Sequence, residues 1–237
     1  MIYITGDTHR DFKRVEFFCK RAETTKDDVL IILGDAGINY YGPGLDSALK
    51  CILEALPVTL LCVHGNHEKR PQSVTVQPGT ACAYDLLPWY GGHAYIESPY
   101  PSIVFAKDGE IYDLGGKRCV VIGGAYSVDK EIRLAQRLGW WPDEQPSVEI
   151  KHRVRAMLIN SHWKVDVVLS HTCPHKYIPR EMFLAGIDQR DVDDSTERWL
   201  DGIEKELDYS RWYCGHWHTN KTVDKMRFMF NDFIELQ

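Results

Sequence analysis

Short apolar runs and amphipathic stretches alternate along the first part of the chain. Continuous apolar runs at residues 29–33 and 58–63 are typical of central parallel strands that are buried on both faces. Residues 11–21 and 45–56 carry apolar side chains at near-helical spacing. Together with a short strand at residues 2–4, these segments give the order strand, helix, strand, helix, strand, which predicts an α/β fold.

The middle of the chain follows another pattern. Residues 71–102 are rich in Pro, Gly and Tyr and show no long period. Three apolar runs follow, and Asp108-Gly109 and Gly115-Gly116 between them predict two hairpin turns of a three-stranded meander. The three runs cover residues 102–106, 110–114 and 117–122.

Helices and strands alternate again in the last part of the chain. The predicted helices cover residues 130–137, 147–162 and 194–207, and Ser147 is a candidate cap for the second of them. The predicted strands cover residues 165–169, 211–214, 221–224 and 227–230. No repeat, low-complexity segment or long linker divides the chain, so residues 1–237 are expected to form a single domain.

Polar side chains follow five of the predicted strands at the point where each strand ends. They are Asp7 and His9, Asp35, Asn66 and His67, His171, and His216 and His218. In open α/β sheets, functional groups gather beyond the carboxyl ends of the strands. Side chains two residues apart point the same way, so the Asp-x-His and His-x-His pairs can reach one ion. Carboxylate, imidazole and amide ligands favour Mn, Fe, Zn or Co, and we favour Mn.

This ligand set fits two divalent ions that share Asp35. The first ion is assigned to Asp7, His9, Asp35 and His218, and the second to Asp35, Asn66, His171 and His216. After the two carboxylates are counted, about two positive charges remain to attract a phosphate and to acidify a bridging water. His67 is not needed as a ligand and is the candidate catalytic acid for the leaving oxygen. His175 is the alternative to His171.

The blocks that contain these residues resemble, in order, the motif set of the calcineurin-like metallophosphoesterases. They are Gly6-Asp7-x-His9, Gly34-Asp35, Gly65-Asn66-His67-Glu68, the strand-end His171 and Gly215-His216-x-His218. The resemblance implies a four-layer α-β-β-α sandwich and the same ligand roles. It also implies a dimetal enzyme that hydrolyses phosphate mono- or diesters by in-line attack of a metal-bridging hydroxide, with His67 assisting the leaving group.

The second block departs from the protein-phosphatase branch of this family. Ile38 stands where that branch has the Asp that pairs with the catalytic histidine, and Asn39 stands where it has a phosphate-binding Arg. A phosphorylated small molecule or a nucleotide is therefore favoured as substrate over a phosphoprotein. In the first block, Arg10 stands where a Gly is frequent. Arg10 and Asn66 are candidate substrate-binding residues, and the alternative for Arg10 is a surface salt bridge.

Several other residues have both a functional and a purely structural interpretation. Lys130 and Arg133 are weaker candidates for phosphate binding. Trp140-Trp141 is a candidate for stacking on a nucleobase, although a packed turn is favoured. His64 is interpreted as structural or exposed, and the acidic residues at 191–194 as a polar turn and helix cap.

Composition and charge narrow the function further. The net charge of −6 argues against a general binder of nucleic acid or membrane surfaces. A metal-dependent nuclease remains an alternative that would need a basic track. A non-catalytic scaffold that binds a partner protein is a second alternative, and it would be marked by missing ligands, whereas none is missing here.

The cysteines and the hydropathy pattern bear on location. There are seven cysteines, an odd number, with no C-x-x-C spacing, which favours reduced thiols in a cytoplasmic protein. The chain has no apolar run long enough for a transmembrane helix and no signal-peptide pattern, so we expect neither.

Overall fold

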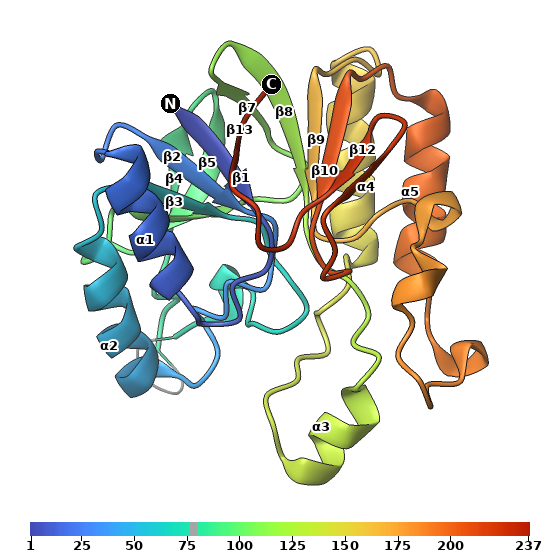
Figure 1. The fold of residues 1–237 in the computed structure, drawn as a ribbon, viewed down its shortest axis with the longest axis horizontal. Coiled ribbons are helices and arrows are strands. Elements are labelled where there is room, and N and C mark those ends of the chain that lie inside the picture. The colour runs from blue at the N-terminus through green and yellow to red at the C-terminus, as the bar shows by residue number, and fades with distance from the viewer. Residues whose placement is uncertain (76–79) are drawn as a thin grey trace.

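The computed structural model describes residues 1–75 and 80–237, which form two mixed sheets packed face to face with helices on both outer sides (Figure 1). The first sheet has the order β13-β1-β2-β3-β6-β5-β4 and the second has the order β11-β12-β10-β9-β8-β7. The first sheet consists of β1 (Ile2–Thr5), β2 (Val29–Ile32), β3 (Thr59–Cys62), β4 (Asp85–Trp89), β5 (Gly92–Ile96), β6 (Ile103–Ala106) and β13 (Ile234–Glu235). The second consists of β7 (Ile111–Leu114), β8 (Lys117–Ile122), β9 (Val167–Ser170), β10 (Arg211–Cys214), β11 (Lys221–Val223) and β12 (Met226–Phe228).

The helices form the two outer layers and one protrusion. The α-helices are α1 (Lys13–Ala22), α2 (Pro43–Glu54), α3 (Lys130–Gln136), α4 (Val148–Asn160) and α5 (Ser195–Glu206). Helices α1 and α2 cover the first sheet, α4 and α5 cover the second, and α3 projects below the edge of both sheets (Figure 1). Short 3₁₀ helices cover Pro71–Ser73, His175–Tyr177, Arg180–Met182 and Gln189–Asp191.

Buried apolar side chains fill the three spaces between these layers. Between the two sheets, Ile4 and Leu61 pack in one cluster with Val121 and Tyr213 of the opposite sheet. A second cluster joins α4 and α5 to one sheet, and a third joins α1 and α2 to the other. The four-layer α-β-β-α prediction is confirmed.

The parallel strands bring the predicted site residues to one edge. In the first sheet β1, β2, β3 and β6 are parallel, and in the second β8, β9, β10 and β12 are parallel. Their carboxyl ends point toward the side from which α3 projects (Figure 1). The strand-end motifs of both sheets therefore meet between the sheets at this edge.

The predicted three-stranded meander is wrong. Strand β6 pairs with β3 and β5 in the first sheet, whereas β7 and β8 form a hairpin in the second. The Gly115-Gly116 turn has positive φ at both positions, as a tight hairpin requires. At the other turn signal, the buried carboxylate of Asp108 is held by Arg70 at 2.6 Å, and the chain crosses between the sheets. A turn signal marks a change of direction but does not identify the sheet that the next strand joins.

Three strands had no counterpart in the hydrophobic pattern. Strands β4 and β5 lie within residues 71–102, of which residues 76–79 are outside the described residues. Strand β4 is an edge strand that contains Pro88 and exposes most of its side chains, so it shows no alternation. Strand β13 has two residues, too few for a periodic pattern. No helix in the described part of the chain is long and apolar enough to cross a membrane.

Candidate metal centre

Glycines allow the strand ends to pack directly against one another. A Cβ atom at position 65 would lie 2.0 Å from Asp35 Oδ1, and one at position 34 would lie 2.0 Å from His171 Nδ1. Gly34 also has a φ of +96°, which L side chains rarely adopt. In both blocks the Gly directly before a predicted ligand has no side chain. This allows the block to lie against a predicted ligand from another block.

Two carboxylates lie at the centre of the site, and each is fixed by a backbone amide from a different block. The amide of His216 donates to Asp7 Oδ1 at 2.9 Å, and the amide of His67 donates to Asp35 Oδ1 at 2.8 Å. The second oxygen of Asp7, Oδ2, is buried and takes part in no hydrogen bond. Burial raises the pKa of Asp7, but the surrounding imidazoles lower it more, so this carboxyl is held ionised. A buried, unpartnered carboxylate oxygen is the expected place for a cation.

His171 and Asn66 face each other with two acceptor atoms. The His171 Nδ1–H donates to the carbonyl oxygen of Leu33 at 2.8 Å, which leaves the lone pair of a neutral ring on Nε2. The amide nitrogen of Asn66 donates to Ser127 Oγ at 2.9 Å, which directs Asn66 Oδ1 toward that Nε2 at 2.8 Å. Two lone pairs at this separation repel each other, whereas a divalent ion bound by both removes the conflict.

A second pair of facing ring nitrogens comes from the first and last blocks. His9 Nε2 and His218 Nε2 lie 2.9 Å apart. Asp7 Oδ2 lies 3.7 Å from His9 Nε2 and 3.4 Å from His218 Nε2, and Asp35 Oδ2 lies 3.9 Å from His9 Nδ1. These atoms surround a small space on the more exposed side of the centre.

His216 belongs to the buried side of the centre. Its ring packs against His171, with 5.0 Å between the ring centroids. Burial and the neighbouring His171 lower the pKa of His216 to about 3. The ring is therefore neutral at physiological pH, and the neutral imidazole is the form that binds metal ions.

Several site residues have backbone conformations that side chains rarely adopt. The residues with positive φ include His9 at 45°, Asp35 at 49°, His216 at 64° and His218 at 47°. Each such conformation costs about 1–3 kcal/mol and persists where the surrounding structure imposes it. This concentration of strain at the five-block edge indicates a functional site.

The residues present fit a pair of divalent ions. Potential ligand atoms lie within 4.8 Å of one another in three groups, which are Asp7, His9 and His218; His9, Asp35 and His67; and Asp7, Asp35 and His171. Asp7, His9 and Asp35 each belong to two of these groups, so the three groups adjoin one another. The mixture of carboxylate, imidazole and amide oxygen suits Mn, Fe, Zn or Co.

His67 lies beside the centre, between the carboxylates and the α3 segment. Its Nδ1 is 4.0 Å from Asp35 Oδ2 and 2.9 Å from a guanidinium nitrogen of Arg133, and its Nε2 is 3.7 Å from Asp129 Oδ1. Burial lowers the pKa of His67, but the interactions with Asp129 and Asp35 raise it more, so the net shift is upward. A histidine with this pKa is suited to giving and taking protons.

Arg10 lies away from the pocket that opens onto the centre. Its guanidinium donates to Asp46 Oδ1 and to the carbonyl oxygen of Gly37, both at 2.7 Å. It also lies over the ring of Tyr41, 4.7 Å from the centroid. This placement favours the salt-bridge alternative for Arg10 over a role in substrate binding.

The two positions that depart from the protein-phosphatase pattern face the protein interior. Ile38 is buried in the core beneath α1 and α2, and Asn39 Oδ1 accepts a hydrogen bond from the Tyr84 hydroxyl at 2.9 Å. His175, the alternative ligand, lies 3.2 Å from Asp194 Oδ2. His64 is buried, and neither of its ring nitrogens has a hydrogen-bond partner among the described residues.

The aromatic and basic residues near α3 have separate partners. The Lys130 ammonium lies 4.6 Å from the ring centroid of Trp140, whose indole N–H donates to Glu144 at 2.8 Å. Trp141 packs edge to face against Tyr40. These contacts favour the packed-turn interpretation of Trp140-Trp141.

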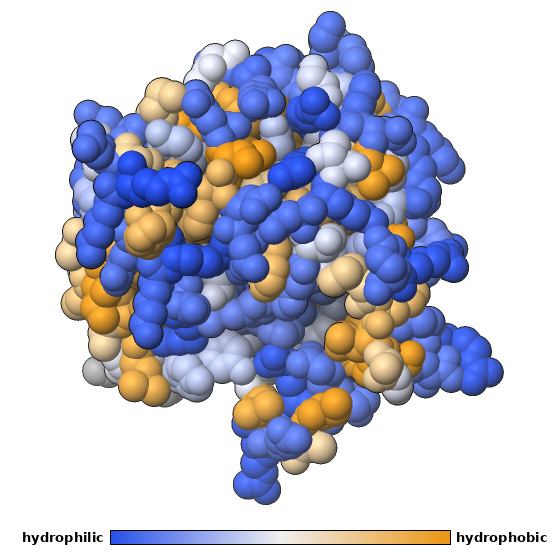
Figure 2. All heavy atoms as spheres, viewed as in Figure 1, coloured by the Kyte–Doolittle hydropathy of each residue, from blue (hydrophilic) through white to orange (hydrophobic). Residues whose placement is uncertain are grey.

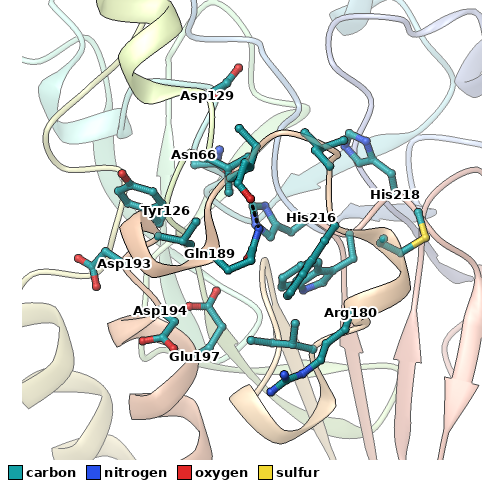
Figure 3. Close-up of a pocket in the computed structure, with 18 of the residues that line it drawn as sticks. Asn66, Tyr126, Asp129, Arg180, Gln189, Asp193, Asp194, Glu197, His216 and His218 are labelled. Carbon is teal, nitrogen blue, oxygen red and sulfur yellow. Dashed lines mark hydrogen bonds between the residues drawn. The ribbon is translucent and has the colours of Figure 1, made fainter.

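A cavity of about 490 Å³ opens onto the centre. Asn66, His216 and His218 lie on one side of it, and Arg180, Asp194 and Glu197 lie on the other (Figure 3). Its remaining wall is largely apolar and comes from the segment between β9 and α5, with Ile178, Met182, Phe183, Leu184, Ile187 and Val192. Apolar side chains also appear on the α3 protrusion at the bottom of Figure 2.

Sequence reasoning missed the residues that support the ligands. Ser127 Oγ, which accepts from Asn66, donates to Glu144 Oε2 at 2.5 Å. No sequence signal points to Asp129, which faces His67, and the signal for Arg133 is weak. The 123–144 stretch has no periodic pattern, and its only usable signal was the concentration of Gly, Ser, Asp and Trp residues in a loop.

Comparison with known proteins agrees with this description. The family described as calcineurin-like phosphoesterase matches residues 1–220 of the 237 residues, and the chain belongs to this family. The family is dimetal-dependent and acts on phosphorylated substrates. No curated protein matches the chain. Among solved structures, the chain is similar to the protein of unknown function AQ665 from Aquifex aeolicus, with 16% identity, a TM-score of 0.34, and coverage of 73% of this chain and 80% of that one.

Proposed function

We propose that this protein is a dimetal phosphoesterase that hydrolyses small phosphate esters. The observation that carries the proposal is the convergence of acceptor atoms from five strand ends, with the two facing pairs His171–Asn66 and His9–His218 at 2.8 and 2.9 Å. One ion is held by Asp7, His9, Asp35 and His218, and the other by Asp35, Asn66, His171 and His216. Mn is the favoured metal.

Each part of the centre has a separate task. When bound, the ions supply an activated water and positive charge against the phosphate oxygens. The backbone amides of His216 and His67 keep the two carboxylates in place while the substrate binds. The imidazolium form of His67 gives a proton to the leaving oxygen from Nδ1, the ring nitrogen on the side of Asp35, and is left as the neutral ring.

The pocket supports a small substrate with an apolar organic group. Among the described residues that line it, Arg180 is the only Lys or Arg, whereas Asp129, Asp193, Asp194 and Glu197 are all acidic. A nucleic-acid backbone would meet this negative surface without the basic track that it needs. The same acidic wall disfavours the nuclease alternative, and the buried Ile38 disfavours a protein-phosphatase mechanism.

Two further observations bear on the location of the protein and on the scaffold alternative. All seven cysteines are free, which supports a reducing, cytoplasmic location. Two observations argue against the scaffold alternative. The ligand set is complete, and the backbone at His9, Asp35 and His216 is strained, whereas a non-catalytic scaffold needs neither.

Turnover of two synthetic esters tests the proposal. The Mn-loaded protein is assayed with bis-p-nitrophenyl phosphate and p-nitrophenyl phosphate, beside a His67→Ala variant. We expect metal-dependent hydrolysis of at least one ester and a loss of kcat of about 10²–10⁴-fold in the variant, with its bound metal retained. Wild-type turnover in the variant would remove the catalytic role of His67, and the ratio of the two esters gives the diester or monoester preference.

A further inference from the structure

The catalytic candidate His67 has two charged neighbours that belong to neither the metal centre nor the strand-end motifs. Asp129 immediately precedes α3, and Arg133 lies one turn into that helix. Arg133 Nε donates to Asp129 Oδ2 at 2.7 Å, and Arg133 is also held by the Tyr40 hydroxyl at 3.1 Å and the Gly139 carbonyl at 3.0 Å. The pair is therefore fixed in place before any substrate arrives.

The remaining contacts of this pair determine the state of the imidazole. A guanidinium only donates, so His67 Nδ1, 2.9 Å from an Arg133 nitrogen, accepts and carries no proton. The ring proton then lies on Nε2, which is 3.7 Å from Asp129 Oδ1. That carboxylate oxygen is buried and has no hydrogen-bond partner, although Arg133 fixes the other oxygen. A small approach of the ring completes an Nε2–H hydrogen bond to Asp129.

We propose that Asp129 and Arg133 are positioning residues for His67 and hold its neutral ring as the Nε2–H tautomer. This inference rests on the proposed function for its catalytic meaning, but the tautomer can be measured without turnover. To act as an acid, His67 first takes a proton from solvent on Nδ1, in place of the hydrogen bond from Arg133, and then gives that proton to the leaving oxygen. The ring returns to the Nε2–H tautomer, and Asp129 accepts from Nε2 in both protonation states. Arg133 keeps the Asp129 carboxylate in the orientation that this requires.

Asp129 and Arg133 lie beside His67 but come from the α3 segment rather than from a strand of either sheet. Ile38 and Asn39, which follow β2, are both buried. Ile38 lies in the core beneath α1 and α2, and Asn39 accepts a hydrogen bond from Tyr84. The α3 protrusion lies beyond the edge of the two sheets (Figure 1), and its Arg133 lies 2.9 Å from His67 Nδ1. The α3 segment therefore carries exposed apolar residues together with Asp129 and Arg133, the two polar residues beside His67.

The test combines a spectroscopic and a kinetic measurement on matched variants. Long-range ¹H–¹⁵N NMR of the Zn-loaded protein at mildly alkaline pH reports the His67 tautomer, with the His67→Ala variant identifying the signal. We expect the Nε2–H pattern in the wild type and its loss or mixing in Asp129→Asn and Arg133→Met. Glu131→Gln and Arg137→Met make the same charge changes at exposed positions of the α3 segment and should leave the signal unchanged. An Nδ1–H tautomer in the wild type would overturn the inference.

The kinetic measurement compares p-nitrophenyl and phenyl esters, which differ in the need for a proton on the leaving oxygen. Asp129→Asn should lower kcat for the phenyl ester by about tenfold or more and for the p-nitrophenyl ester by less, with KM and bound metal unchanged. In the His67→Ala background, the same substitution should have no further effect. An equal loss for both esters, or a full additional loss without His67, would contradict positioning through His67. Lack of turnover in the wild type would count against the proposed function alone, because the tautomer result stands without it.

Discussion

At the residue scale, the centre depends on glycine as much as on its ligands. Position 65 has no room for a methyl group, because a Cβ atom there would lie 2.0 Å from Asp35 Oδ1 and 2.1 Å from the Asp35 backbone nitrogen. The Gly65-Asn66 block would have to move away from Asp35, and the amide of His67 would lose its 2.8 Å bond to that carboxylate. A substitution that removes no ligand can therefore damage the metal site.

We accordingly expect Gly65→Ala to lower the amount of metal bound per chain. Metal affinity should fall by about tenfold or more, the range seen when supporting contacts of a metal site are removed. Gly202→Ala is the matched control, because position 202 is an exposed position in α5 with no atom near the added methyl group. Equal metal content in the two variants, measured by elemental analysis, would contradict this explanation of the Gly-Asn-His block.

The control substitution carries its own expectation. Glycine within a helix is less favourable than alanine by about 0.5–1 kcal/mol. Gly202→Ala should therefore raise the free energy of unfolding by about this amount, as measured by urea denaturation. A decrease would show that position 202 has a contact that the structure does not account for.

Most of the predicted ligands follow a strong local signal in the sequence. Asp7, Asp35, Asn66 and His216 each come directly after Gly at the end of an apolar run, and parallel strands bring such ends together. His171 lacks the Gly, and the structure places it against Asn66 rather than leaving that position to His175. The roles of Ser127 and Asp129 could not be predicted, because their partners lie about 60 residues away in the chain.

At the element scale, the stretch from β8 to α4 supports the ligand Asn66. Ser127 accepts from the Asn66 amide and donates to Glu144, and Glu144 also accepts from the Trp140 indole. This chain of hydrogen bonds fixes which atom of the Asn66 amide faces His171. The sequence of this loop indicates no firm function, yet the loop fixes the orientation of the Asn66 side chain.

Ser127→Ala should consequently weaken metal binding and turnover while leaving all seven ligands in place. The expected loss of metal affinity is about 10–100-fold, because Asn66 can rotate once its Ser127 partner is gone. Ser73→Ala provides a control at an exposed serine whose hydroxyl also donates to an acidic residue of this stretch, Asp143. Titration of the metal-free proteins with Mn measures both affinities, and equal values would remove the supporting role of Ser127.

The errors in the fold prediction have a common physical cause at this scale. Hydrophobic periodicity reports whether a strand is buried, and β6 is buried on both faces whichever sheet it joins. Pairing of β6 with β3 was therefore not visible in the pattern, and neither was the exposed edge strand β4. The helices were predicted closely because their apolar faces repeat over several turns, as in α5.

At the scale of the whole molecule, buried acids make stability depend on pH. Burial raises the pKa of Glu197 to about 7 from its ordinary value of 4.5, although its carboxylate accepts a hydrogen bond from the Thr172 hydroxyl at 2.7 Å. The folded state keeps this proton up to about pH 7, whereas the unfolded chain loses it near pH 4.5. The free energy of unfolding therefore falls as pH rises between these two values.

Glu197→Gln removes this contribution, so its stability should fall less over the same pH interval than that of the wild type. The difference in the pH-dependent change is expected to be about 1–3 kcal/mol. Glu206→Gln, at an exposed position of the same helix, should follow the wild-type curve. Chemical denaturation at pH values across the interval measures all three curves, and parallel curves for Glu197→Gln and the wild type would contradict the raised pKa.

The central claim is that one pair of divalent ions is bound where the two sheets meet, and metal stoichiometry tests it most directly. The folded protein, purified with Mn and freed of excess metal, is analysed for metal per chain together with an Asp35→Asn variant, because Asp35 is the ligand assigned to both ions. We predict about two ions per chain in the wild type and a loss affecting both ions in the variant. A wild-type protein that is folded and binds no divalent ion, or an Asp35→Asn variant that still binds two, would contradict the account.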